Sequence, residues 1–223
     1  MIIRFFDIIF SLFALLFLMP ILLPVLILLC FTGERKIFYL QKRVGLGEKK
    51  FSLIKFATML ENSPNLGTGN ITVMDDPRVL PFGKFLRKSK INELPQLYNI
   101  LIGNMSVVGP RPLTEDIFNL YDSDIKVLVT SKRPGLTGMG SIIFRDEETI
   151  LDQKIDQTRF YADFISAYKG ELESWYMENN SLYLYFKIIF VTALVTLNPK
   201  KKIGSYFFKD LPAPPQELES MLN

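Results

Sequence analysis

The chain has 223 residues, with 26 lysines and arginines against 23 acids, and its net charge of +3 is too small to indicate a nucleic-acid partner. It has no histidine, which excludes Ser-His and Cys-His nucleophile pairs and a His-ligated zinc site. Its one cysteine, Cys30, excludes a disulfide within the chain and agrees with a reducing compartment. Catalysis therefore has to use carboxylates, cationic side chains, amides, hydroxyls or a hard metal ion held by oxygen.

The first predicted element is a long apolar helix. The segment from Ile8 to Phe31 carries no charge and exceeds the roughly 20 helical residues that cross a hydrocarbon core of about 30 Å. Pro20 and Pro24 each remove a backbone hydrogen bond and bend the helix. Arg4 precedes the segment and a basic stretch follows it, as expected for two cytoplasmic flanks.

These features favour a re-entrant membrane helix over residues 1–33, which enters one leaflet, bends and leaves on the same side. A single-pass anchor with a proline kink is the alternative, because membranes tolerate kinked spans. A cleaved signal peptide is disfavoured, since the apolar run is too long and no small-residue cleavage site follows it.

The next segment is basic and predicts a β-hairpin. Between Glu34 and Lys55 there are seven lysines and arginines against two acids, which suits anionic headgroups or a phosphorylated substrate, or else a solvated basic loop. Short strands are expected at 37–40, 44–47 and 51–54, with Gly45 and Gly47 near the turn.

Most of the remaining chain is predicted to be helical. Residues 60–76 read as a loop, and residues 82–102 as two short helices joined near Asn92. Two Gly/Pro loops, at 106–112 and 133–140, flank a helix over 114–130 that Thr114 would cap. Residues 146–176 are charged and helical, and residues 181–197 form an interfacial helix or a buried core helix. The basic, proline-rich tail over 200–223 is expected to be disordered at its end.

Four arginines lie in or near the rigid turns: Arg87, Arg111, Arg133 and Arg145. The planar guanidinium binds phosphate oxygens in pairs, and proline would hold such a loop in place. One arginine of this kind is more often a surface ion pair, but four indicate a diphosphate substrate.

Glu93 is the most informative carboxylate, because it lies beside Asn92 in an apolar, proline-containing segment. Magnesium takes one or two protein carboxylates together with substrate phosphates, so Glu93 is a candidate Mg²⁺ ligand. An ordinary acid at a helix start is the alternative.

Short motifs follow one another along nearly the whole chain: Arg4-x-x-Asp7, Phe38-x-x-Gln41-x-Arg43-x-Gly45, Lys55-Phe56-x-Thr58-Met59, Gly83-x-Phe85-Leu86-Arg87, Asn92-Glu93-Leu94-Pro95-Gln96-Leu97, Val108-Gly109-Pro110-Arg111-Pro112, and Arg133-Pro134-Gly135-x-Thr137-Gly138 followed by Arg145. In this order they resemble the bacterial sugar transferase family, the monotopic phosphoglycosyl transferases that start glycan assembly on a polyprenyl phosphate. The resemblance implies a mostly α fold with a small β-hairpin, an N-terminal re-entrant helix, interfacial helices and a cytoplasmic catalytic domain over 34–199.

The resemblance also implies a reaction and its site. A nucleotide diphosphate sugar would donate its sugar phosphate to a polyprenyl phosphate in two steps through an Asp carboxylate, with Mg²⁺ offsetting the charge. The setting would be the cytoplasmic face of the bacterial inner membrane, among membrane phospholipids, with a homodimer left open. The implied site comprises catalytic Asn92 and Glu93, Glu93 as metal ligand, membrane residues Arg4, Pro20 and Pro24, and substrate-binding Lys55, Arg87, Gln96, Arg111, Arg133 and Arg145.

The chain departs from the family pattern at the catalytic pair, where Asn92 replaces the nucleophilic Asp. Three explanations stay open: Glu93 or another carboxylate serves as nucleophile or base, the protein binds its substrates without turnover, or Asn92 is an engineered change. Met19 and Ala57 also depart, replacing a serine and a basic residue, and residues 146–170 form an extra charged segment.

Overall fold

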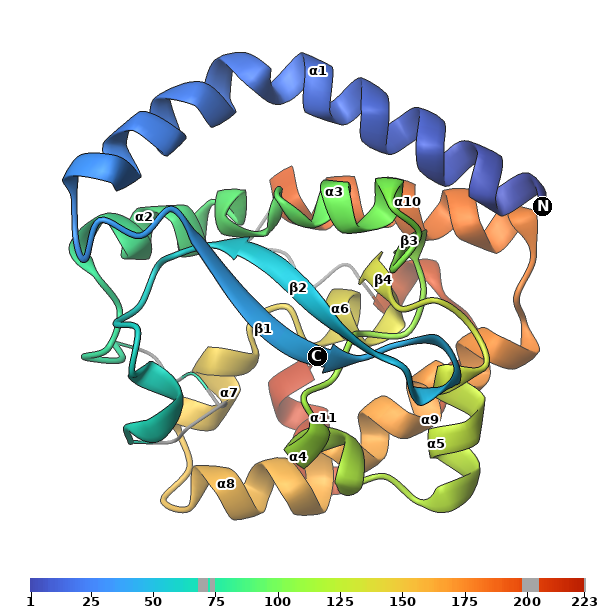
Figure 1. Ribbon diagram of the computed structural model, residues 1–223. Coiled ribbons are helices and arrows are strands. Elements are labelled where there is room, and N and C mark those ends of the chain that lie inside the picture. The colour runs from blue at the N-terminus through green and yellow to red at the C-terminus, as the bar shows by residue number, and fades with distance from the viewer. Residues whose placement is uncertain (68–71, 73–74, 198–204, 223) are drawn as a thin grey trace.

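The computed structural model describes residues 1–67, 72, 75–197 and 205–222. Over these residues the molecule is mostly helical, with two sheets of two strands each (Figure 1). The predicted mostly α fold with a small β-hairpin is therefore confirmed.

Helix α1 (Ile2–Phe31) is continuous through Pro20 and Pro24 and arches over α2 (Pro81–Lys88) and α3 (Gln96–Leu101) (Figure 1). Near its C-terminal end, Leu29 packs in a buried cluster with Phe56 and Leu86. Most other apolar side chains of α1 face outward. Among the described residues, α1 is the one helix long and apolar enough to cross a membrane.

The N-terminal end of α1 is held to the same body by buried polar contacts. Asp7 is 2% exposed, and its carboxylate accepts hydrogen bonds from the Ser106 hydroxyl, the Val107 amide and the Tyr185 hydroxyl at 2.8–2.9 Å. Arg4 donates to two carbonyls at the C-terminal end of α3, at 2.5 and 2.8 Å. Both ends of α1 are thus packed against one body.

The hairpin consists of β1 (Phe38–Val44) and β2 (Lys50–Phe56), paired antiparallel with Tyr39 opposite Lys55. The strand expected at 44–47 is wrong. Val44 ends β1, and Gly47 adopts φ +59° in the turn, where a residue without Cβ is favoured.

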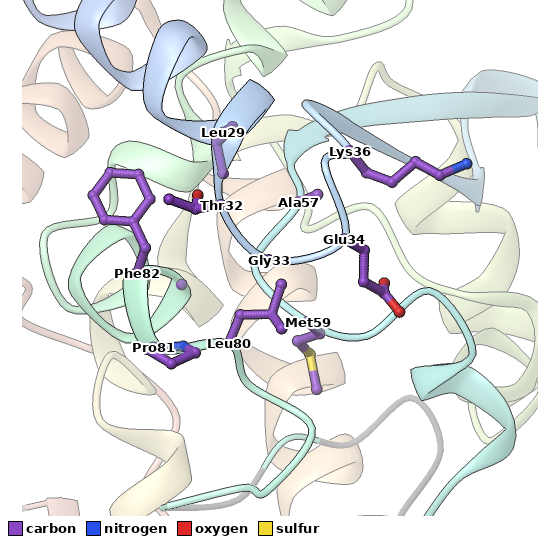
Figure 2. A pocket seen from close by; sticks show the side chains of 11 residues that line it. Leu29, Thr32, Gly33, Glu34, Lys36, Ala57, Met59, Leu80, Pro81 and Phe82 are labelled. Atoms are coloured by element: carbon purple, nitrogen blue, oxygen red, sulfur yellow. The ribbon is translucent and has the colours of Figure 1, made fainter.

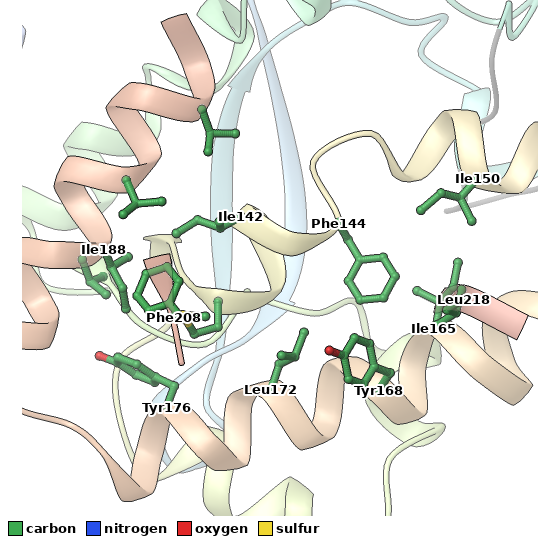
Figure 3. Close-up of a cluster of buried hydrophobic side chains, with 14 of the residues drawn as sticks. Ile142, Phe144, Ile150, Ile165, Tyr168, Leu172, Tyr176, Ile188, Phe208 and Leu218 are labelled. Atoms are coloured by element: carbon green, nitrogen blue, oxygen red, sulfur yellow. The ribbon is translucent and has the colours of Figure 1, made fainter. Parts of the chain in front are cut away.

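The main core lies between α6 (Met139–Ile143), α9 (Ser166–Glu178) and α10 (Leu182–Leu197) (Figure 3). Leu172 and Ile188 are fully buried there. On the opposite face of α10, Tyr183 and Phe190 are exposed. One face of α10 thus packs in the core, as the buried-helix alternative for residues 181–197 requires, while the other face is an exposed apolar surface and the interfacial position stays a prediction.

The described part of the C-terminal segment, residues 205–222, packs against this core. Phe208 and Leu218 are buried in the same cluster, and α11 (Gln216–Leu222) carries Leu218. The disorder predicted at the end of the tail is therefore wrong over 205–222, because these apolar side chains gain burial that the proline-rich composition concealed. Residues 200–204, the basic start of the tail, lie outside the described residues.

The helix expected at 114–130 is two helices, α4 (Glu115–Asn119) and α5 (Ser123–Thr130), because Asp122 adopts an extended conformation between them. Thr114 does precede α4, but its side chain makes no capping hydrogen bond. The charged segment after Arg145 forms α7 (Glu147–Asp152), α8 (Gln157–Phe160) and a π-helical turn (Tyr161–Ile165) that continues into α9.

The two Gly/Pro loops contain strands that the sequence did not predict. β3 (Ser106–Val108) and β4 (Gly135–Thr137) pair in parallel. A Cβ on Gly135 would lie 2.2 Å from the Gly109 amide nitrogen, so the close approach of the two segments requires glycine. Strands of three residues beside glycine and proline show no periodicity, which explains why they read as loops.

Candidate active site

Glu93 and Lys55 form the centre of the candidate site. Glu93 ends the short 3-10 helix η3 (Ile91–Glu93), which joins the segment after α2 to α3. Lys55 lies near the end of β2, and its Nζ is 3.8 Å from Glu93 Oε1. The two side chains are 19% and 22% exposed, so both remain accessible to a ligand.

Nearby cations keep Glu93 ionised. Burial by itself would raise the pKa of the Glu93 carboxyl, but the charges of Lys55, Arg111, Lys90 and Arg87 outweigh it and lower that pKa to about 2. Glu93 is therefore a carboxylate throughout the physiological pH range, and a weak base.

The cations around Glu93 repel one another. Burial lowers the pKa of Lys55 to about 7, and Arg43 and Arg111 oppose the stabilising charge of Glu93. Burial and the charge of Arg111 also lower the pKa of Arg43 to about 10. An anion that entered the site would relieve this repulsion, so the electrostatics favour a ligand with several negative charges.

The loop after β3 presents Arg111 to this centre. The loop is fixed by β4, because the Gly109 amide donates to the Thr137 carbonyl at 3.0 Å and the Gly135 amide donates to the Pro110 carbonyl at 2.8 Å. Arg111 as a residue is exposed; local desolvation opposes its charge, but Glu93 and other acids raise its pKa above the usual value. These hydrogen bonds fix the backbone just before Arg111, while its role in binding phosphate stays a prediction.

Glu173 of α9 is a site residue that sequence reasoning missed. It is 3% exposed, and its carboxylate accepts hydrogen bonds from the backbone amides of Arg111 and Gly140. Burial raises the pKa of Glu173 to about 7, although these donors and the charge of Lys169 act in the opposite direction. Nothing distinguishes Glu173 from the other acids of a charged helix until α9 packs against the arginine loop.

Several of these residues carry a buried polar atom without a hydrogen-bond partner. Among the described residues, the buried side-chain polar atoms without a hydrogen-bond partner are Asn92 Oδ1, Thr114 Oγ1, Arg145 Nη1 and Glu173 Oε2. Three of the four belong to predicted site residues or to the support of Arg111. Buried polar groups are ordinarily paired, so these atoms indicate where a polar ligand completes the structure.

Arg87 contributes its charge from α2. Its Nη2 lies 2.5 Å from Glu148 Oε1, and its Nη1 lies 3.8 Å from Met59 Sδ. Gln96, another predicted binding residue, begins α3 and is buried.

The Arg133 side chain contacts the end of α3, and its predicted role in substrate binding stays a prediction. Its Nε donates to the Gly103 carbonyl at 2.7 Å, and a Cβ on Gly103 would lie 3.5 Å from Arg4 Nη2. The backbones of the two loops are close, because a Cβ on Gly109 would lie 2.5 Å from the Arg133 carbonyl oxygen. The Arg133 side chain itself is directed to the Gly103 carbonyl, just after α3.

The site has few oxygen ligands for a metal. No group of three or more acidic, histidine or cysteine side chains that could hold an ion occurs in the part of the chain that the structure describes. Glu93 would offer one carboxylate, and Asn92, the preceding residue, would offer an amide oxygen that is buried without a hydrogen-bond partner. This donor set fits Mg²⁺, which binds through one or two protein oxygens when substrate phosphates supply others.

Residues 1–199 match the sequence model of a family described as bacterial sugar transferase, a match that includes every site residue above. The chain belongs to this family. Its relatives include the exopolysaccharide production protein ExoY of Rhizobium meliloti, 34% identical over 74% of this chain and 82% of the relative.

Two further relatives of this sugar transferase are named for their reactions. The undecaprenyl-phosphate galactose phosphotransferase of Salmonella typhimurium is 31% identical over 91% of this chain and 41% of the relative. The UDP-glucose:undecaprenyl-phosphate glucose-1-phosphate transferase of Xanthomonas campestris pv. campestris is 31% identical over 87% and 38%. The chain thus spans about two fifths of the length of these two relatives.

Proposed function

We propose that this sugar transferase moves a sugar-1-phosphate from a nucleotide diphosphate sugar to a polyprenyl phosphate and so begins the assembly of a glycan. The observation that carries the proposal is the ionised Glu93 within a group of cations, Lys55, Arg87 and Arg111. The names of the relatives in Salmonella and Xanthomonas favour this transferase over a non-catalytic binding protein.

The reaction exchanges one P–O bond for another. The bond between the sugar-bearing phosphorus and the bridging oxygen of the diphosphate breaks, and the nucleoside monophosphate leaves with that oxygen. A new bond joins the same phosphorus to a phosphate oxygen of the polyprenyl acceptor, which gives a lipid-linked diphosphate. The guanidinium and ammonium groups of Arg111, Arg87 and Lys55 stabilise the negative charge that develops on the transferred group.

The low pKa of Glu93 restricts its role. A carboxylate with a pKa of about 2 accepts protons poorly at neutral pH, so Glu93 is a poor general base. It is a permanent anion next to the transferred phosphoryl group, which suits a nucleophile or a metal ligand. Asn92 has no charged oxygen, so we place the essential negative charge of the pair on Glu93.

Mg²⁺ would be held by Glu93 and Asn92 Oδ1 together with diphosphate oxygens, and it would neutralise charge on the departing monophosphate. The cations of the chain do the same for the oxygens that they reach, and they position the diphosphate before the reaction.

The proposed location is the cytoplasmic face of the bacterial inner membrane, with α1 as a re-entrant helix that contacts membrane phospholipids. Support comes from the two ends of α1, since Asp7 and Leu29 both pack against one body. A helix that spanned the bilayer would leave one of its ends on the far side. The homodimer stays a prediction.

Topology can be tested with cysteines placed at Ile2 and Glu34, both exposed, after the exposed Cys30 is replaced by serine. A membrane-impermeant maleimide is expected to label both positions in inverted inner-membrane vesicles and neither in intact spheroplasts. Labelling of the two positions from opposite sides would show that α1 spans the membrane.

The activity itself can be tested with membranes that contain the chain, a polyprenyl phosphate and a panel of radiolabelled nucleotide sugars. We expect one donor to yield a lipid-linked sugar diphosphate and an equal amount of nucleoside monophosphate. If none of the common donors yields lipid-linked product, the transferase assignment fails for this chain.

A further inference from the structure

A cavity of about 320 Å³ lies beside the candidate active site, between the C-terminal end of α1, the end of β2 and the start of α2 (Figure 2). Its apolar lining includes Leu29, Ala57, Leu80 and Phe82. The volume is within the range of about 300–1,000 Å³ that is usual for small-molecule sites. The cavity has no local signal in the sequence, because its walls come from three separate segments.

Two elements connect the cavity to the cations of the site. On β2 and its extension, Lys55 and Ala57 are two residues apart and therefore share one face, about 7 Å from each other. On α2, Gly83 lines the cavity and Arg87 follows one turn later on the same side. Met59, which also lines the cavity, contacts the Arg87 guanidinium with its sulfur at 3.8 Å.

The charged side chains of the cavity lining are already paired with other groups. Lys36 Nζ lies 3.2 Å from Glu61 Oε1, and Glu34 accepts a hydrogen bond from the Glu61 amide at 2.6 Å. Figure 2 shows Glu34 and Lys36 extending away from the apolar side chains that line the cavity. A nucleotide base needs hydrogen-bond donors and acceptors, whereas this cavity offers mainly apolar contacts.

The cavity also adjoins the apolar surface of α1. Leu29 forms part of its wall, while the neighbouring Leu28 and Phe31 are exposed, Phe31 by 80%. An apolar chain that leaves the cavity can therefore continue along the outer face of α1, the face that would contact lipid.

We infer that this cavity binds the first isoprenoid units of the polyprenyl acceptor, with the acceptor phosphate at Lys55 and Arg87. The inference rests on the proposed function and names the acceptor subsite of the same site. An amphiphile with an anionic end and an unsaturated hydrocarbon chain matches a cation pair adjoining an apolar cavity. The small side chain of Ala57 leaves room that a larger residue would fill.

The first experiment uses the wild-type full chain in nanodiscs and a farnesyl phosphate that carries a diazirine on its first isoprenoid unit. Irradiation is expected to label the cavity segments, 57–59 and 80–83. Excess polyprenyl phosphate should abolish the label, whereas phosphatidic acid should not. Labelling elsewhere, or displacement by phosphatidic acid, overturns the assignment.

The second experiment fills the cavity with Ala57→Phe and uses Ala167→Phe, on the exposed surface of α9, as the matched control. We expect the KM for polyprenyl phosphate to rise at least about tenfold in Ala57→Phe, with the KM for the donor within twofold and neither constant changed in the control. An unchanged acceptor KM in a folded Ala57→Phe protein overturns the inference.

The two proposals fail separately, because photolabelling requires no turnover. If the chain is labelled in the cavity but forms no product, the acceptor site in the cavity stands and the transferase assignment is refuted. If the chain forms product but is labelled elsewhere, the transferase assignment stands and the acceptor site in the cavity is refuted.

Discussion

Replacement of Glu93 by glutamine is expected to reduce sugar-phosphate transfer by about a thousandfold. Glutamine preserves the shape of the side chain but removes the negative charge that Lys55, Arg111, Lys90 and Arg87 surround. Loss of one preorganised electrostatic group in an active site commonly costs 100-fold to 1,000-fold, and loss of a nucleophile costs more. The measurement is the initial rate of nucleoside monophosphate release by purified protein.

The matched control is Glu115→Gln, which removes an exposed acid that pairs with Lys50 outside the site. Its rate should stay within about twofold of wild type. Equal rates for Glu93→Gln and Glu115→Gln would show that Glu93 is not part of the machinery.

Position 92 supplies a further arm of the same experiment. If Glu93 carries the essential charge, Asn92→Asp changes the rate by less than about tenfold. A gain near a thousandfold would show instead that the chain lacks its nucleophile, and it would move the covalent step to position 92. If neither the wild type nor Asn92→Asp is active, the results would favour a protein that binds its substrates without turnover.

Asp7→Ala is expected to destabilise the folded protein by about 3–5 kcal/mol. The substitution leaves the Ser106 hydroxyl, the Val107 amide and the Tyr185 hydroxyl buried without their shared acceptor. For a chain of this size the melting temperature should fall by roughly 10 °C or more, measured by thermal unfolding in detergent. Asp7 thus fastens α1 to β3 and α10.

Asp7→Asn separates hydrogen bonding from charge, because the amide oxygen still accepts from Val107 or a hydroxyl. Its melting temperature should lie between those of the wild type and Asp7→Ala. If Asp7→Ala has the same melting temperature as the wild type, these contacts do not hold the N-terminal end of α1.

Local patterns predicted the features that depend on neighbours in sequence. The long apolar run predicted α1, because an uncharged segment has a simple composition signal. The glycines after Val44 indicated the hairpin turn, although not which residues end each strand. Arg111 was identified because proline and glycine surround it, and such a loop holds an arginine wherever it lies.

Long-range pairing could not be read in the same way. The parallel strands β3 and β4 are three residues each and have no periodic signal, yet their pairing brings together the two Gly/Pro loops that carry Arg111 and Arg133. Glu173 lies about 60 residues after Arg111, and its contact with the arginine loop exists only because α9 packs there. The order of the C-terminal tail could not be predicted from local sequence either, because Leu218 is buried by residues far from it in sequence.

The sequence alone was enough to identify an apolar helix suited to a membrane, the resemblance to a family, and the residue types available for phosphate chemistry. Composition and ordered motifs can be read from neighbouring residues, without the tertiary structure. The charge state of Glu93, the contact of Arg133 with the end of α3 and the apolar cavity at Ala57 were decided by tertiary structure. Each depends on distances between segments far apart in sequence, and both Coulomb energies and packing vary with those distances.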